Sequence, residues 1–202
     1  MPGMPGFLQH AAQPLPGQPE CCKTLTAEVA PLLELIDFAQ LSAIIDTHSG
    51  TGTIAAEFKK VGLRVVTNDI NIQHKAQHHL DTLQPASYKQ LRSLYGRRTA
   101  FVTSPWFRML DIVLPLTVLA SPQVACMHVP GHYLTDAHPA RLQYLRSLLQ
   151  QGRLVTVMGL PRSVMGRRCL WLLIFASALV RQRLMKGSHG NIVMLDLDAV
   201  RF

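Results

Sequence analysis

Acidic residues and glycines follow two neighbouring apolar segments in the first half of the chain. Asp46 ends the run 43–45, and Gly50 and Gly52 come shortly after it. A second acid, Asp69, closes the next apolar run 19 positions after Gly50. Two glycines one residue apart let the chain turn tightly and let a ligand approach the backbone. A carboxylate at the end of the next strand can bind both hydroxyls of a ribose. The spacing therefore predicts a nucleoside site.

The acid that precedes the glycines indicates the kind of nucleoside. Gly50, Gly52 and Ala55 also satisfy the dinucleotide pattern Gly-x-Gly-x-x-Ala, so an NAD-type oxidoreductase is one alternative. A dinucleotide loop usually begins with glycine directly after the strand, so that pyrophosphate can lie on the helix N-terminus. Here Asp46 comes first, and a carboxylate repels phosphate. S-adenosylmethionine (SAM) carries an amino group and a sulfonium but no phosphate, and it suits this loop better.

A second segment, Ser104-Pro105-Trp106-Phe107, follows the apolar run 99–103. It resembles a motif of the amino-methyltransferases, and this resemblance implies methylation of an exocyclic amine on a nucleobase. Such an amine is a poor nucleophile, because its lone pair is delocalised into the ring. The Ser104 hydroxyl and the Pro105 carbonyl could accept hydrogen bonds from its two N–H groups and favour a nitrogen that can attack a methyl group. Phe107 could stack on a base that has left a duplex or is already single-stranded.

Both segments resemble motifs of the class I SAM-dependent methyltransferases. The loop that begins at Asp46 resembles the first motif of this family, and Asp69 resembles the acid at the end of its second strand. The segment 104–107 resembles the Asp/Asn/Ser-Pro-Pro-aromatic motif of the DNA/RNA amino-methyltransferases, which modify N6 of adenine or N4 of cytosine. The resemblance implies that Ile70 packs on the adenine of SAM and that Asp81 lies near its amino group. The residues expected to bind SAM are Asp46, His48, Gly50, Gly52, Asp69, Ile70 and Asp81.

The sequence departs from that motif at Trp106, where the family usually has a second proline. Proline would stiffen the loop by fixing φ. Trp106 therefore either leaves the loop looser or is itself the stacking residue. A protein that kept the fold and binds nucleic acid, but is impaired in catalysis, is the main alternative to an active methyltransferase.

Apolar runs that alternate with helical patterns must position these loops. Helices are expected to begin near Thr24 or Thr26 and to span 53–61, 85–95, 109–119 and 139–151. Strands are expected at 43–46, 63–67, 79–81, 99–103, 124–129, 154–158 and 170–175, with 192–197 as a further edge strand. This alternation predicts an α/β fold: a doubly wound, mainly parallel, seven-stranded Rossmann-like sheet with helices on both faces.

Length and composition limit the organisation of the chain. It has 202 residues, of which 48% are hydrophobic, enough for one domain with a buried core. Residues 1–23 are rich in proline and glycine and predict a disordered tail, followed by a single methyltransferase domain at 24–202. The longest apolar run, 169–180, is shorter than the roughly 20 residues of a membrane span, so no membrane partner is expected. Four cysteines without a disulfide pattern indicate a reducing, intracellular location, cytoplasmic or nuclear.

The net charge of +8 is unevenly distributed. Residues 1–90 carry a net charge of −2, and residues 91–202 carry +10. A basic half predicts a polyanionic partner, here DNA or RNA as substrate. Only 95 residues follow Phe107, and the remaining strands and helices use most of them, so low or loop-encoded sequence specificity is expected. The residues expected to bind substrate are Arg108, Tyr133, Arg162, Arg167 and Arg168.

Histidines at 74, 78 and 79 raise the question of a metal site. His74 and His78 are spaced as ligands on one helical face would be. No third ligand follows at a recognisable spacing, so a solvated loop is the preferred interpretation and no metal is expected.

Overall fold

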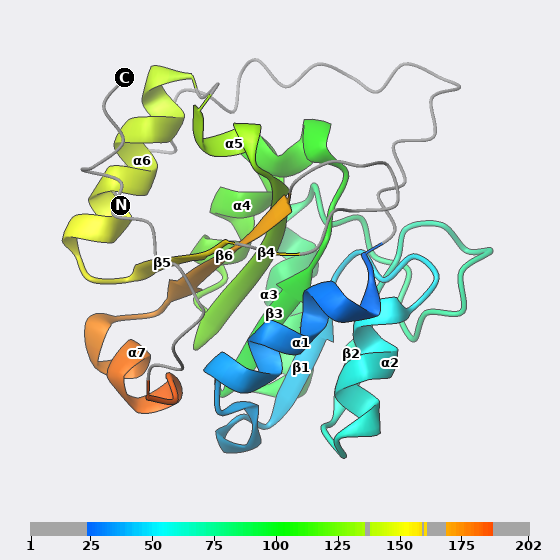
Figure 1. Cartoon of the computed structure of the whole chain (residues 1–202). Coiled ribbons are helices and arrows are strands. Elements are labelled where there is room, and N and C mark those ends of the chain that lie inside the picture. Colours follow the sequence, from blue (N-terminus) through cyan, green and yellow to red (C-terminus); the bar gives the residue numbers. More distant parts are fainter. Residues whose placement is uncertain (1–23, 136–137, 159, 161–168, 188–202) are drawn as a thin grey trace.

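The computed structural model describes residues 24–135, 138–158, 160 and 169–187. Its centre is a sheet of six strands in the order β2-β1-β3-β4-β6-β5 (Figure 1). Strands β2, β1, β3 and β4 are parallel, whereas β6 is antiparallel to both of its neighbours. The strands span Ala43–Asp46 (β1), Val65–Thr67 (β2), Thr99–Thr103 (β3), Val124–Pro130 (β4), Leu154–Val157 (β5) and Cys169–Phe175 (β6).

The mixed α/β class and the mainly parallel sheet are confirmed, but seven strands are not. The predicted strand at 79–81 does not form, and only an isolated bridge joins Asn68 to His78. The cause lies in the side chain of Asn68, which accepts from the Leu80 N–H at 2.9 Å and donates to the Leu80 carbonyl at 3.0 Å. The N–H and the carbonyl of Leu80, which a strand would use for pairing, are therefore already hydrogen-bonded to a side chain. The predicted strand at 192–197 lies outside the described residues.

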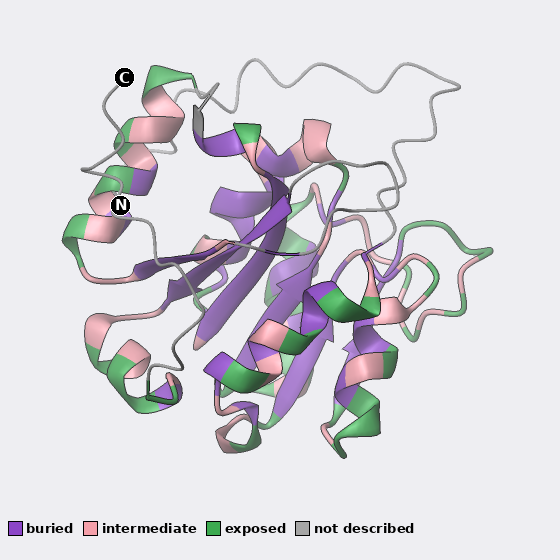
Figure 2. Cartoon of the chain, in the orientation of Figure 1, coloured by how far each residue is buried: buried purple, intermediate pink, exposed green. Residues whose placement is uncertain are grey.

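Helices cover both faces of the sheet, as predicted (Figures 1 and 2). Helices α1, α2 and α7 pack on one face, and α3, α4 and α6 pack on the other. The helices span Thr26–Leu35 (α1), Thr53–Lys60 (α2), Pro85–Tyr95 (α3), Leu110–Leu119 (α4), His132–Thr135 (α5), Pro139–Gln150 (α6) and Ala178–Leu184 (α7), with 3-10 turns at Phe38–Gln40 (η2) and Phe107–Met109 (η3). Helix α7 was not predicted, because its first residues continue the apolar run of β6.

The strands are buried along their whole length, which explains their continuous apolar sequences (Figure 2). Successive side chains point to opposite faces of the sheet. Along β4, Val124 and Cys126 pack on the side of α1, whereas Ala125 and Met127 pack on the side of α4. The same alternation sends His128, a polar residue in an apolar strand, towards α1.

The parallel strands place their carboxyl ends at one edge of the sheet. The loops after β1, β2 and β3 therefore meet there. Because β6 runs antiparallel to β4, its first residue, Cys169, pairs with Pro130 at this same edge. The predicted site residues up to residue 107 therefore lie on loops at one end of the sheet. Among the described residues, no helix is long and apolar enough to cross a membrane.

Candidate functional site

The loop after β1 has a backbone shape that depends on its two glycines. Gly50 and Gly52 have φ values of +49° and +83°, a region that L side chains rarely adopt. A Cβ atom built at either position would meet no heavy atom within 4 Å. Gly52 also caps the N-terminus of α2. The loop therefore turns into the helix and leaves open space beside its backbone, as a bound ligand requires.

Asp69 is hydrogen-bonded to this loop. Its Oδ2 accepts from the Gly50 N–H at 2.7 Å, and its Oδ1 accepts from the Asn71 N–H at 2.9 Å. Nδ1 of His74 lies 3.1 Å from Oδ2. Burial raises the pKa of Asp69, but the two amide hydrogen bonds and His74 outweigh it and hold the pKa below its ordinary value. Both oxygens already have amide partners, so hydroxyls of a ribose would use their remaining lone pairs. The next residue, Ile70, leaves 63% of its surface exposed.

Asp46 ends β1 and is fully buried. Its Oδ1 lies 3.4 Å from the His48 N–H, and its Oδ2 has no hydrogen-bond partner among the described residues. Burial raises the pKa of Asp46 to about 7, although the His48 amide and the Thr103 hydroxyl lower it. A buried acceptor without a partner is costly. A cationic group bound at the glycine loop would satisfy it.

His48 joins three segments of the site. Its Nδ1 lies 3.1 Å from the Thr103 hydroxyl oxygen and 3.0 Å from that of Thr47. Its Nε2 lies 2.8 Å from the Thr82 hydroxyl oxygen. Burial lowers the pKa of His48 to about 4, although Asp69 and Asp81 raise it, so the imidazole is neutral at pH 7. A neutral imidazole among hydroxyls cross-links the loop after β1, the end of β3 and the segment before α3.

Sequence reasoning placed His48 at the cofactor loop but missed two of its three threonine partners, Thr103 and Thr82. Thr103 is the residue directly before Ser104, and Thr82 follows Asp81. Asp81 is partly buried, and its Oδ1 accepts from the Leu83 N–H at 2.9 Å. Threonines at such positions are common in turns, so the sequence carried no separate signal for this cluster.

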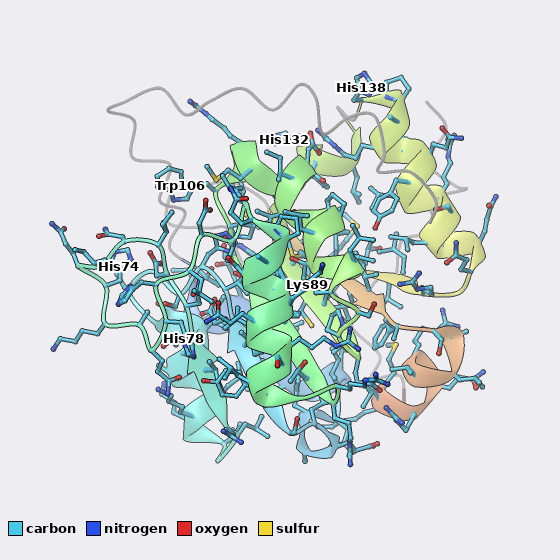
Figure 3. The ribbon with its side chains drawn as sticks, turned by 180° about the vertical axis from the view of Figure 1, so that it is seen from behind. His74, His78, Lys89, Trp106, His132 and His138 are labelled. Carbon is cyan, nitrogen blue, oxygen red and sulfur yellow. The ribbon has the colours of Figure 1, made fainter. Side chains whose placement is uncertain are left out.

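The segment after β3 begins at Ser104, which is half-buried. Its Oγ lies 3.2 Å from Nδ1 of His128, a buried histidine of β4 that sequence reasoning did not single out. Pro105 is buried. Trp106 leaves 49% of its surface exposed and stands at the rim of the molecule (Figure 3). Phe107 is partly buried and packs against the apolar cluster on the α4 side of the sheet.

Comparison with known proteins gave matches in structure but not in sequence. No protein-family model matches the chain, and the curated proteins gave no match. A SAM-dependent methyltransferase from Archaeoglobus fulgidus matches with a TM-score of 0.53 at 12% identity, over 74% of this chain and 92% of that chain. An O-methyltransferase from Bacillus cereus in complex with SAH matches with a TM-score of 0.51 at 10% identity, over 74% and 80% of the two chains. The chain has a SAM-dependent methyltransferase fold.

A third structure of this fold belongs to a larger protein. It is the methyltransferase subunit of a type I restriction-modification system from Streptococcus thermophilus, with a TM-score of 0.51 at 14% identity. The match covers 80% of this chain but only 44% of that one. These identities establish the fold, and the functional argument depends on the site residues of this chain.

Tyr133, which was expected to bind substrate, is buried. It is 4% exposed, and its hydroxyl donates to Oδ1 of Asp111 at 3.1 Å. Arg141 binds both oxygens of Asp111, at 2.7 and 2.6 Å, and its guanidinium lies 4.2 Å from the centre of the Tyr133 ring. Tyr133 is thus held in a cluster that joins α4, α5 and α6. Arg108 is half-buried on η3, and the remaining predicted substrate residues, Arg162, Arg167 and Arg168, lie outside the described residues.

The histidines after β2 have separate partners. Nε2 of His78 lies 2.6 Å from the Tyr95 hydroxyl oxygen, whereas His74 contacts Asp69. Both lie on the loop between β2 and α3 rather than on a helix (Figure 3). The i, i+4 spacing therefore does not bring them to a common point.

Proposed function

We propose that the chain is a SAM-dependent methyltransferase that transfers a methyl group to an exocyclic amine of a nucleobase in DNA or RNA. The observation that carries this proposal is the contact network of His48. It ties the glycine loop, where a nucleoside cofactor would bind, to Thr103, the residue before Ser104. A loop suited to SAM and a loop suited to an amine are therefore fixed side by side.

The residues present fit SAM. Asp46 offers a buried acceptor with no partner in the described part of the chain, which suits the amino group of the cofactor. The open space beside Gly50 and Gly52 admits a ligand against the backbone. Asp69 has lone pairs left for ribose hydroxyls, and the exposed Ile70 offers an apolar surface for the adenine. SAM would supply a methyl group activated by its sulfonium.

Ser104 and Pro105 would prepare the acceptor. The Ser104 oxygen and the Pro105 carbonyl would accept hydrogen bonds from the two N–H groups of the amine. The nitrogen lone pair would then point at the methyl carbon. SAM would supply the methyl carbon and leave as the neutral thioether, and the methylated amine would release one proton to solvent. Ser104 is held for this role by His128, whose Nδ1 lies 3.2 Å from its oxygen. Trp106 is exposed beside Ser104 and can stack on the target base.

The test is methyl transfer from SAM carrying a deuterated methyl group to a mixture of DNA and RNA. Digested nucleosides are then analysed by mass spectrometry. We expect labelled N6-methyladenine or N4-methylcytosine, lost in Ser104→Ala and retained in Ser93→Ala, which changes an exposed serine of α3. Titration with SAM is run in parallel.

Each combination of SAM binding, nucleic-acid binding and methyl transfer distinguishes one of the alternatives. SAM binding with an unlabelled nucleoside pool and no nucleic-acid binding would refute a nucleobase substrate. Salt-sensitive nucleic-acid binding without methyl transfer would favour the catalytically impaired alternative. Absence of SAM binding would refute the cofactor assignment on which the rest depends.

A further inference from the structure

Three side chains with metal-binding atoms lie close together next to Ser104. They are Glu28 of α1, His128 of β4 and Cys169 of β6. One carboxylate oxygen, one imidazole nitrogen and the sulfur all lie within 4.8 Å of one another. All three residues are buried, with exposures of 0%, 0% and 4%. Nothing in the proposed methyl transfer requires this grouping.

The fold accounts for the convergence. His128 pairs with Trp171, and Pro130 pairs with Cys169, so His128 and Cys169 are diagonal neighbours across antiparallel strands. The alternation of side chains places both on the face covered by α1. Glu28 lies in the first turn of α1, and its backbone carbonyl accepts from the Trp171 indole N–H at 2.6 Å. The helix is thereby held with Glu28 over the two strands.

The charge of Glu28 is not balanced by any lysine or arginine among the described residues. Its Oε2 accepts from the Leu25 N–H at 2.6 Å. Its Oε1 lies 3.3 Å from Nε2 of His128, yet both atoms lack a hydrogen-bond partner among the described residues, because their alignment does not meet hydrogen-bond geometry. A buried carboxylate oxygen and a buried imidazole nitrogen without partners are both costly. One carboxylate oxygen, one imidazole nitrogen and the sulfur of Cys169 lie within 4.8 Å of one another, so a single point is near all three donors.

A zinc ion at that point would satisfy both atoms. Zinc binds imidazole nitrogen and carboxylate oxygen at about 2.0 to 2.2 Å, which separates two ligands of a tetrahedron by about 3.3 Å. The measured Nε2–Oε1 distance is 3.3 Å. Sulfur, nitrogen and oxygen together are a donor set that favours zinc over magnesium or calcium. A thiolate and a carboxylate also neutralise the two charges of Zn²⁺ in this buried place.

We infer that Glu28, His128 and Cys169 form a zinc site that fixes the position of Ser104. Ligation of zinc through Nε2 places the imidazole proton on Nδ1, which then donates to Oγ of Ser104 at 3.2 Å. The second nitrogen of a zinc-bound histidine commonly has such a partner. The Ser104 oxygen keeps a lone pair for another donor. The sequence spacing gave no sign of this site, because its ligands are 100 and 41 residues apart.

The metal content of the full-length chain tests the site. Protein produced in medium supplemented with zinc is dialysed and analysed by elemental mass spectrometry. We expect one zinc per chain, reduced at least tenfold in Cys169→Ser and unchanged in Cys126→Ser. Cys126 is a matched control, because it is a buried cysteine on the same face of β4 and is not part of the cluster. Circular dichroism checks that both variants are folded.

Cobalt keeps the inference testable if Cys169→Ser does not fold. Co²⁺ added to the zinc-free parent should give a thiolate-to-metal absorption band in the near ultraviolet and visible bands typical of four-coordinate Co²⁺. Equal zinc in the parent and Cys169→Ser would overturn the inference. So would a folded, metal-free parent that gives no cobalt bands and whose melting temperature does not respond to Zn²⁺. That result would leave Glu28 and His128 as a buried contact without a metal. Neither readout requires methyl transfer, so this inference can fail while the proposed function stands.

Discussion

Nδ1 of His48 lies 3.1 Å from the hydroxyl oxygen of Thr103, and this contact joins the glycine loop after β1 to the end of β3. Neither residue is expected to touch the reacting atoms. Their contact fixes the distance between the segment that would hold SAM and the residue that would hold the amine. A small displacement between two reacting groups reduces the rate far more than it reduces binding of either one.

Thr103→Val should therefore slow turnover more than it weakens SAM binding, which it affects only through the pKa of Asp46. Valine keeps the shape of threonine but cannot hydrogen-bond to His48. We expect kcat to fall about tenfold, which corresponds to one lost hydrogen bond of about 1.4 kcal/mol. Methyl transfer under saturating SAM measures kcat, and titration calorimetry measures the Kd for SAM.

The control is Thr99→Val at the opposite end of the same strand. Thr99 is also buried, and its hydroxyl donates to the Gly96 carbonyl at 3.4 Å, away from the site. Equal losses of kcat in the two variants would mean that His48 and Thr103 support only the stability of the strand.

Asp69→Asn should weaken SAM binding. The amide of asparagine has one oxygen instead of two, so the contact with either the Gly50 or the Asn71 N–H is lost. The negative charge that favours ribose hydroxyls is lost as well. We expect the Kd for SAM to rise 10- to 100-fold, measured by calorimetry. Asp37→Asn, a change near η2 and away from the loop, should leave it unchanged; an unaltered Kd in Asp69→Asn would remove Asp69 from the cofactor site.

The sequence was sufficient to predict the parts of the fold that depend on local patterns. The apolar runs of β1 and β3 and the helix from Pro85 to Tyr95 were predicted with their observed bounds. That the loops holding Gly50 and Asp69 lie at one edge of the sheet was also predicted, because two neighbouring parallel strands end there; the hydrogen bond between the two residues was not. These features need only periodicity and the geometry of a parallel unit.

Features that depend on distant side chains were not predictable. The segment at 79–81 has the composition of a short strand, but the side chain of Asn68 binds the backbone of Leu80 instead. The antiparallel pairing of β6 brings Cys169 and His128 together from distant parts of the chain. Tyr133 was expected at the substrate and lies buried against Asp111, a partner 22 positions earlier. No local pattern encodes such contacts.

Asp46 should make the protein less stable as the pH rises towards 7. Its pKa is about 7 in the folded chain and near 3.8 when unfolded, so the folded state binds more protons between these values. Stability falls with pH wherever the folded state binds more protons. From below pH 4 to above pH 7, Asp46 alone should lower the free energy of unfolding by about 4 kcal/mol. Urea unfolding at pH 5 and pH 8 should show about 3 kcal/mol of this change, because the carboxyl of the unfolded chain is already mostly ionised at pH 5.

Asp46→Asn is the matched control, because asparagine does not titrate. Its unfolding free energy should change less between pH 5 and pH 8 than that of the parent. SAM should bind the parent more tightly as the pH rises through 7, since the ionised carboxylate attracts a cationic group, and this dependence should be absent from the variant. Parallel pH profiles for parent and variant, in both measurements, would show that Asp46 does not titrate in this range.

Trp106→Pro tests whether the departure from the family motif affects the loop or the substrate. Trp106 has φ −56° and ψ 129°, and proline fixes φ near this value. The Trp106 carbonyl, which accepts from the Met109 N–H at 2.8 Å, is kept in the variant. We therefore expect an unchanged melting temperature. If Trp106 stacks on the base, its loss should raise the KM for nucleic acid about 5- to 150-fold, as expected for a stacking contact of about 1–3 kcal/mol.

The companion variant Trp106→Phe should restore most of the affinity, because it keeps an aromatic ring at the same place. A KM that stays at the parent value in Trp106→Pro would exclude stacking by Trp106. A rise in kcat in the same variant would instead show that the tryptophan loosens the loop and that proline supplies the missing stiffness.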